Sequence, residues 1–512
     1  MRRLAGIGLV ISVIFSSGIV FADNQPQKSN PSLSSSAEQR VLTQPSAELR
    51  SPYPLASNSE SVADVVGAEA GAPATNDVKR LATNEPVAMN AVYVAGLNTT
   101  VINVVWTLLC TFLVFLMQAG FAMVETGFTR AKNAGHTMAM NMMVFVFGIL
   151  GYWICGYAIQ MGGKGFFLAG DASIAMLFLP RVVSLNISAT IPTGAMAERW
   201  TFKSFMVYGF FIAMFTYPLY ANWVWGGGWL AHLGRNLGLG HGVIDFAGSS
   251  VVHMVGGVSA LAGAIVLGPR TGKFKADGTP SAITGHHIPM AIVGCFILFF
   301  GWLGLNSGSS LALSDMRIGV IVANTMLASV AASFSAMCYM WFFYGKPDLS
   351  LSANGLLAGL VAITAACAFV GPIGAVIIGF VAGVLCCMSV FFIERKLKID
   401  DPVGAVSVHG TCGAWGLIAL GLFADGTYGD GLNDVPGTVK GLFYGGASQF
   451  LAEIIGVVVN FVFVFSVMYV FFKALDRIIP LRVSEEVEFE GLDQNEVSVS
   501  AYPDFHLGKT HR

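Results

Sequence analysis

Charged side chains are scarce in this sequence. Asp, Glu, Lys and Arg together make up 11% of the 512 residues, whereas apolar residues make up 54%. Soluble domains carry about 25% charged residues, so this composition excludes an ordinary soluble protein and predicts a polytopic protein embedded in a lipid bilayer. The formal net charge of -2 gives no support for a nucleic-acid partner.

The sequence also lacks any cysteine spacing typical of a metal or redox site. All eight cysteines fall within apolar segments, and the adjacent Cys386 and Cys387 cannot form a C-x-x-C motif. We interpret the cysteines as small buried hydrophobic residues, and we expect no metal, no cofactor and no enzymatic activity. Glycine, in contrast, is abundant, with 60 residues, which in a membrane protein favours close approach of helices.

The first 22 residues predict a secretory signal peptide that is cleaved. Two arginines precede a short apolar core that ends at Phe21 and Ala22. An additional membrane helix is the alternative, but a polar tract follows the core where a stop-transfer signal would be required. Residues 23–98 are rich in Ser, Pro, Ala and Asn, so we expect them to form a disordered periplasmic leader.

Apolar segments of about 20 residues follow, each long enough to cross a hydrocarbon core of roughly 30 Å. We expect eleven transmembrane helices at 103–125, 139–161, 174–196, 202–224, 245–268, 287–307, 317–344, 353–370, 372–394, 404–423 and 450–473. The fold class is therefore an all-α polytopic membrane protein. Its membrane domain is expected over residues 99–476, and a cytoplasmic tail over 477–512.

The basic residues of the short loops are distributed unequally between the two sides of the membrane. The richer side carries Arg130, Lys132, Arg199, Lys203, Arg270, Lys273, Lys275, Lys346, Arg395, Lys396 and Lys398. The other side carries Lys164, Arg235, Arg317 and Lys440. By the positive-inside rule the richer side is cytoplasmic. We therefore expect a periplasmic N-terminus and a cytoplasmic C-terminus in the inner membrane.

Two segments of the membrane domain share the pattern D-x2-G-x4-H-x3-G. They read DFAGSSVVHMVGG from Asp245 and DPVGAVSVHGTCG from Asp401. The first opens the fifth span and the second precedes the tenth, and an odd number of spans separates them. The two halves, 103–268 and 287–423, must then have opposite topology, which predicts a 5+5 inverted repeat followed by a final helix at 450–473.

The pattern places one histidine of each half near the middle of the membrane. Eight helical residues at 1.5 Å each carry the chain roughly 12 Å inward from either face. His253 and His409 therefore end near the midplane and are predicted to meet. Gly257 and Gly413 lie one turn further along and leave room for a neighbouring helix.

Two classes of function fit a pair of histidines at the midplane, because ionisable groups within a membrane usually mark ion or proton paths. One class is bis-histidine haem ligation, although electron transfer across a membrane typically needs more than the one pair present. The other is a conduction path. Neutral imidazoles offer both a donor and an acceptor, which suits a small hydrogen-bonding molecule or a relayed proton.

Further motifs accompany the two histidine segments. They are MQAGFAMVETGFTRAKNAGHT (117–137), GAMAER (194–199), WVWGGGWLA (223–231), GWLGLNSGSS (301–310) and LRVSEEVEFEGLD (481–493). Together, and in this order, they resemble the ammonium transporter (Amt/Rh) family of the bacterial Amt type, over about residues 103–493. The resemblance implies transport of ammonium or ammonia for nitrogen uptake by a homotrimer in which each subunit has its own pore.

The resemblance also implies roles for residues near the outer mouth of the pore. Trp225 and Ser309 match an outer site that recruits ammonium, where the indole face holds a cation. An interfacial anchor is the alternative for this tryptophan. Asp245 and Trp302 match residues that shape the site without binding the ion.

His253 and His409 match the paired pore histidines of the family. An ammonium ion that enters hydrocarbon loses its hydration at a cost of several kcal/mol or more. Loss of a proton at the mouth removes most of this cost, so that neutral ammonia passes the histidines. The proton either returns by another exit or is relayed separately along the imidazoles. A potassium ion has no proton to release and is therefore excluded.

The chain departs from the family pattern at the outer gate. The family usually has two stacked phenylalanines there, whereas these positions read Ser184 and Leu305. A shift of the alignment by one turn would let Phe178 supply an aromatic ring. Arg181, in the same span, requires a partner or water. The altered gate predicts changed gating or selectivity, or an ammonium sensor with slow or no transport.

Gly491, Leu492 and Asp493 match the regulatory tail of the family. The tail is too short to form a catalytic signalling domain. We expect it to dock on the cytoplasmic face or on a PII-type regulator, and an acidic solvated tail is the alternative.

Overall fold

The computed structural model describes residues 85–432 and 435–504. Within these residues it contains helices and loops but no strand. The predicted signal peptide, residues 23–84 of the predicted leader and the last eight residues of the tail lie outside the described residues.

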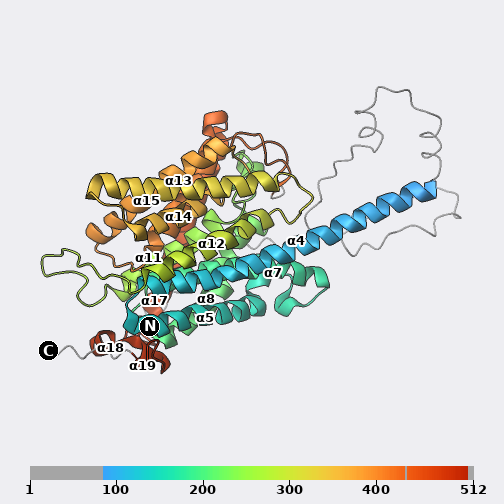
Figure 1. The fold of residues 1–512 in the computed structure, drawn as a ribbon. Helices are drawn as coiled ribbons and strands as arrows, with labels where there is room; N and C mark the ends of the chain where they lie inside the picture. The colour runs from blue at the N-terminus through green and yellow to red at the C-terminus, as the bar shows by residue number, and fades with distance from the viewer. Residues whose placement is uncertain (1–84, 433–434, 505–512) are drawn as a thin grey trace, which may run out of the picture. The chain divides into compact units, whose positions relative to one another are not determined.

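The long helices follow one another along the chain in Figure 1. They are α4 (Glu85–Phe128), α5 (Ala134–Gly151) continued by η3 (Tyr152–Gly156) and α6 (Tyr157–Gln160), α7 (Ala172–Ala195), α8 (Phe202–Phe211) continued by η5 (Ile212–Thr216) and α9 (Tyr217–Trp225), η6 (Ser249–Met254) continued by α11 (Val255–Leu267), α12 (Ile288–Gly308), α13 (Ile318–Tyr344), α14 (Leu349–Ile363), α15 (Pro372–Arg395), η7 (Val406–Thr411) continued by α16 (Cys412–Phe423), and α17 (Ala447–Leu475). The short helices are η2 (Ala131–Asn133), η4 (Phe166–Leu168), α10 (Leu233–Leu237), η9 (Leu442–Tyr444), α18 (Glu485–Glu490) and α19 (Leu492–Val497).

Ten helical segments of the described residues are long and apolar enough to cross a membrane. The remaining predicted helix is present as the shorter apolar helix α14, so the eleven helices are confirmed. This eighth helix, expected at 353–370, differs in its bounds, because α14 ends at Ile363 and turns follow over residues 364–369. These turns pair with a second irregular segment, since the N–H groups of Phe246 and Ala247 donate to the carbonyls of Ala365 and Thr364. Irregular backbone at membrane depth is tolerated when it is buried and hydrogen-bonded in this way.

The first helix begins earlier than predicted. Residues 85–98 were expected to belong to the disordered leader, but they form the first part of α4. Pro86 lies in the first turn, where a missing N–H leaves no helical hydrogen bond unmade. The run that follows it is largely apolar and contains no further proline, so nothing in it ends the helix.

The two halves of the membrane domain contain matching elements. The π-helix η6 leads into α11 in the first half, and η7 leads into α16 in the second. Each π-helix packs against the α-helix that follows the other one. Small residues allow close approach elsewhere too, because a side chain at Gly120 of α4 would collide with α12 beside Gly294. This crossed packing brings the middle of both halves together.

One end of the helix bundle is held by a buried ionic cluster that joins four loops. The guanidinium of Arg270 lies 2.8 Å from Asp400 and 3.0 Å from Glu198, and Arg130 also pairs with Glu198. Arg199 donates to the backbone carbonyl of Asp400. Burial alone would raise the pKa of Asp400, but the charges of Arg199 and Arg270 hold it below its ordinary value.

Candidate functional site

The two histidines of the repeated pattern meet in the centre of the bundle. Nδ1 of His253 lies 3.3 Å from Nδ1 of His409. The ring centroids are 5.3 Å apart and the planes are inclined by 23°. His253 is fully buried and His409 is 4% exposed. The meeting inferred from the inverted repeat is therefore present in the structure.

Aromatic rings flank the histidine pair on both sides. Trp302 of α12 stacks on His253 with a centroid distance of 4.7 Å and an interplanar angle of 17°. Its indole N–H donates to the hydroxyl of Thr364 at 2.8 Å, which fixes the ring. Phe121 of α4 lies 5.8 Å from His409. Trp302 was predicted from the sequence, whereas Phe121 was not, although Phe121 lies within the motif MQAGFAMVETGF.

The aspartate of each repeat orients the π-helix that carries the histidine. The carboxylate of Asp245 accepts hydrogen bonds from the backbone N–H groups of residues 248–251 and from the hydroxyl of Ser250. Asp401 accepts in the same way from the N–H groups of Gly404 and Val406. Each carboxylate thus satisfies donors at a helix start that would otherwise be buried without a partner.

The calculation of roughly 12 Å assumed that a helix begins at each aspartate, but the helices begin later. Residues 245–248 are not helical, and η6 begins at Ser249. Gly248 has φ 118° and Gly404 has φ 80°, a left-handed conformation that glycine adopts without a steric penalty. The glycine of D-x2-G is therefore the turn that lets the aspartate reach back to the helix start.

The second glycine of the pattern forms the crossing point of the two halves. A Cβ on Gly257 would collide with the backbone of His409 and Gly410. A Cβ on Gly413 would lie 2.6 Å from the carbonyl oxygen of Ser249. Glycine at these positions is what allows the two histidine segments to touch.

The two residues predicted to recruit ammonium, Trp225 and Ser309, lie at helix ends. They are on the same side of the membrane domain as Asp245. Trp225 ends α9, and its indole N–H donates to the carbonyl of Asp245 at 2.7 Å. Its ring lies against Gly248, where an added Cβ would be 3.3 Å from it. Ser309 follows the end of α12, and its hydroxyl donates to the carbonyl of Leu305. Asp245 itself is 1% exposed, so it lies behind the site.

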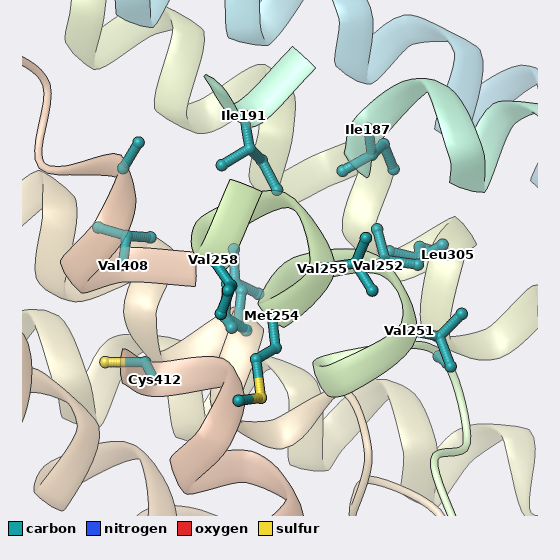
Figure 2. Packing of buried hydrophobic residues seen from close by; sticks show 14 of the residues in the cluster. Ile187, Ile191, Val251, Val252, Met254, Val255, Val258, Leu305, Val408 and Cys412 are labelled. Carbon is teal, nitrogen blue, oxygen red and sulfur yellow. The ribbon is translucent and has the colours of Figure 1, made fainter. Parts of the chain in front are cut away.

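The two altered gate positions are occupied by small or aliphatic buried side chains. Figure 2 shows Leu305 of α12 among the buried hydrophobic residues around η6, which include Val252 and Ile187. The hydroxyl of Ser184 donates to the carbonyl of Pro180 within α7. Phe178 packs instead against Tyr152 and Tyr157, at centroid distances of 5.6 and 5.7 Å. The position of Phe178 therefore does not support the alternative alignment, in which Phe178 would supply an aromatic ring at the gate.

Sequence reasoning also missed a buried carboxylate beside the histidines. A cavity of about 20 Å³ is lined by Glu125, Asn354 and His409 together with apolar side chains. Glu125 is 2% exposed and accepts hydrogen bonds from Asn141 and Thr193, each at 2.6 Å. A signal was present in the sequence, because Glu125 is an acidic residue within an otherwise apolar span.

The C-terminal tail docks on the membrane domain. Gly491 has φ 116°, and a Cβ there would meet the backbone of Lys132. Leu492 is fully buried, and the carboxylate of Asp493 accepts from the backbone N–H groups of Gly135 and His136 at the start of α5. Figure 1 shows α18 and α19 near this helix. Burial raises the pKa of Asp493, and these hydrogen bonds partly offset the rise.

The histidine pair does not suit a haem. Two imidazoles that ligate one iron must lie on opposite faces of a porphyrin, whereas these two rings contact one another directly. In the part of the chain that the structure describes, no three His, Cys, Asp or Glu side chains gather as metal ligands would. The geometry therefore favours the conduction path over the membrane cytochrome.

Comparisons with known proteins all lead to ammonium transporters. The family model described as Ammonium Transporter Family matches residues 105–502. Ammonium transporter Amt2 of Archaeoglobus fulgidus is 45% identical over 422 residues, which are 80% of this chain and 90% of that protein. Ammonium transporter Amt1 of Haloferax mediterranei is 36% identical over 430 residues, covering 79% of this chain and 80% of that protein.

Solved structures of similar fold agree with these relatives. One described as "Sensor Amt Protein" has a TM-score of 0.71 and 34% sequence identity, and the match covers 78% of this chain and 99% of that one. The crystal structure of Candida albicans Mep2 has a TM-score of 0.68 and 27% identity, with 75% of this chain and 87% of that one covered.

Proposed function

This chain belongs to the ammonium transporter family and transports ammonium across a membrane, and from this premise we propose how its residues do so. Ammonium is recruited near Trp225 and Ser309 and gives up a proton there. Neutral ammonia then passes His253 and His409, while the proton is relayed separately along the imidazoles. The observation that carries this proposal is the 3.3 Å contact between the two Nδ1 atoms in a buried, apolar surrounding.

The contact between the Nδ1 atoms sets the protonation of the pair. One Nδ1 donates and the other accepts, so two neutral imidazoles expose one Nε2 acceptor and one Nε2–H donor. A proton that arrives at the acceptor can displace a proton across the Nδ1 pair and release another from the donor. Nε2 of His253 is buried without a hydrogen-bond partner among the described residues, which leaves it available to a passing ammonia molecule.

The outer site is organised by the backbone around Asp245. Its carbonyl orients the Trp225 indole, and its carboxylate is occupied by the N–H groups that begin η6. The indole face therefore supplies the attraction for a cation, and Asp245 keeps that face in place. Ser309, directly after the end of α12, adds a hydroxyl, as the family resemblance implies.

We also propose an orientation from the basic residues of the loops and an assembly from the family resemblance. The ionic cluster gathers basic residues of several loops at one end of the bundle, and by the positive-inside rule that end is cytoplasmic. The C-terminal tail lies there, and the N-terminus is periplasmic. We assign the protein to the inner membrane as a homotrimer. Exposed apolar side chains such as Phe296, Phe334 and Ile373 suit contact with lipid or with neighbouring subunits, and the docked tail offers a surface to a PII-type regulator.

The experiment that tests the path is ammonium-evoked current in proteoliposomes. We expect His253→Ala and His409→Ala each to lower the current at least about tenfold, a change of about 1.4 kcal/mol in the barrier. The matched control is His232→Ala in an outer loop, which should leave the current unchanged. Current that survives in the double variant His253→Ala, His409→Ala would overturn the path.

A second candidate function is an ammonium sensor with slow or no transport. It is favoured by the missing phenylalanines at Ser184 and Leu305 and by the likeness to the structure described as "Sensor Amt Protein". If wild-type protein binds ammonium but gives no current, the sensor is correct and the transport mechanism fails. Leu305→Phe tests the gate directly, because a ring at this buried position should narrow the entrance and change the current.

A further inference from the structure

The cavity beside the histidine pair lies on the exit side of the proposed path. Glu125 is near the end of α4, and the adjoining Gly194 is near the end of α7. Both helices end at the loops of the ionic cluster that contains Arg130 and Glu198. Trp225 lies at the opposite side of the membrane by the order of the spans. The cavity is therefore located between the histidine pair and the cytoplasmic end.

His409 is the member of the pair that faces this cavity. It lines the cavity, whereas His253 does not. It is also 4% exposed while His253 is fully buried. Since Nδ1 of His409 is directed at His253, Nε2 is the nitrogen that remains for the cavity.

The volume and lining of the cavity suit one small polar molecule. About 20 Å³ is enough for one water molecule, and a water is stable in a buried site when it has two to four polar partners. Glu125, Asn354 and His409 provide such partners. The amide nitrogen of Asn354 already donates to the carbonyl of Val403, so its oxygen is left to accept.

The carboxyl group of Glu125 is held in a fixed position. Its Oε2 accepts from the amide of Asn141 on α5 and from the hydroxyl of Thr193 on α7. A Cβ on Gly194 would be 3.0 Å from Oε1, so glycine there gives the carboxyl room. A carboxyl group that is fixed by neighbours on two helices and lines a cavity shared with a pore histidine is placed to exchange a proton.

From this geometry we infer that Glu125 receives the proton that leaves the histidine pair. Protonated His409 donates from Nε2 to a water in the cavity, and that water donates one of its own protons to the carboxylate. Glu125 becomes a neutral acid and the water is restored. The acid then releases its proton to the cytoplasmic side, where it reaches bulk water or recombines with ammonia to form ammonium. This inference rests on the proposed separate relay of proton and ammonia.

Two readouts in proteoliposomes distinguish this role from a structural one. Charge movement is measured as ammonium-evoked current, and ammonia entry is measured by the internal pH rise above that of protein-free vesicles. Glu125→Gln keeps an oxygen that can accept from Asn141 and Thr193, so a structural role predicts little change. We expect it to lower the current at least about tenfold while ammonia entry stays near the wild-type rate. Glu125→Asp should restore part of the current, because it retains a carboxyl group.

The matched control is Glu453→Gln, which removes another fully buried carboxylate that is in α17 and does not line the cavity. It should retain the wild-type current. Wild-type current in Glu125→Gln would overturn the inference. Loss of both the current and ammonia entry would also overturn it, since the whole path would then be damaged. A wild-type protein without current would instead refute the proposed transport mechanism itself.

Discussion

Gly257 provides a quantitative test of how the two halves meet. A Cβ on this residue would lie 2.5 Å from the Cα of Gly410 and 2.7 Å from the carbonyl carbon of His409. Ordinary van der Waals contacts begin near 3.4 Å, so Gly257→Ala must push the two segments apart by roughly 1 Å. Overpacking of this kind costs about 1–3 kcal/mol. Because the histidine contact of 3.3 Å is already near the limit of a hydrogen bond, the same displacement breaks it.

Gly410 supplies the matched control, because it lies in the same crossing and faces Gly257. A Cβ on Gly410 would lie 3.4 Å from the carbonyl carbon of Gly257. This is an ordinary contact, so Gly410→Ala should change stability by no more than about 0.5 kcal/mol. The same substitution is therefore expected to be disruptive at Gly257 and nearly neutral at Gly410.

The assay combines thermal unfolding of the purified protein with ammonium-evoked current in proteoliposomes. Gly257→Ala should lower the unfolding midpoint by a few degrees and reduce the current about as much as loss of one histidine. Gly410→Ala should resemble the wild type in both measurements. Equal effects of the two substitutions, or wild-type current in Gly257→Ala, would refute the view that this glycine sets the distance between the histidines.

Two further predictions concern the cytoplasmic end. Asp493→Ala removes the acceptor for two backbone N–H groups at the start of α5. As for other helix caps, we expect the docking of the tail to lose about 0.5–2 kcal/mol, seen as faster proteolysis of the tail. An unchanged cleavage rate would contradict the docking. Asp400→Asn removes one of the two carboxylates that pair with the buried guanidinium of Arg270 and should cost about 3–5 kcal/mol of stability. Asp315→Asn, in the partly exposed pair with Arg317, should cost at most about 1 kcal/mol. Similar changes in the unfolding midpoint for both would contradict this ranking.

The sequence was sufficient to predict the centre of the site, because two symmetric constraints act there. The pattern D-x2-G-x4-H-x3-G occurs once in each half, and the parity of the spans forces opposite topology. These two facts bring His253 and His409 together without any knowledge of the intervening helices. The family motifs then extended the prediction to Trp225, Ser309 and the tail.

Local backbone geometry was not predictable in the same way. Apolar composition cannot distinguish a helix from a buried turn, so residues 364–369 were expected to continue the eighth span. The missing information is the hydrogen-bond partner of this segment, which is supplied by Phe246 and Ala247 in the other half. Glu125 and Phe121 were missed for a similar reason, since only the fold shows that one turn of α4 faces His409.

The repeat itself is symmetric, but the surroundings of its two histidines are not. His253 stacks on Trp302, whose indole N–H is fixed by a threonine, and it is fully buried. His409 adjoins Phe121 and lines a cavity that Glu125 also lines. A proton on the pair thus has a carboxyl group at the shared cavity on the cytoplasmic side. Because the same acceptor serves entry and exit of the proton, Glu125→Gln should impair charge movement in both vesicle orientations. Trp302→Phe, which removes the indole N–H but keeps a ring beside His253, should retain the current.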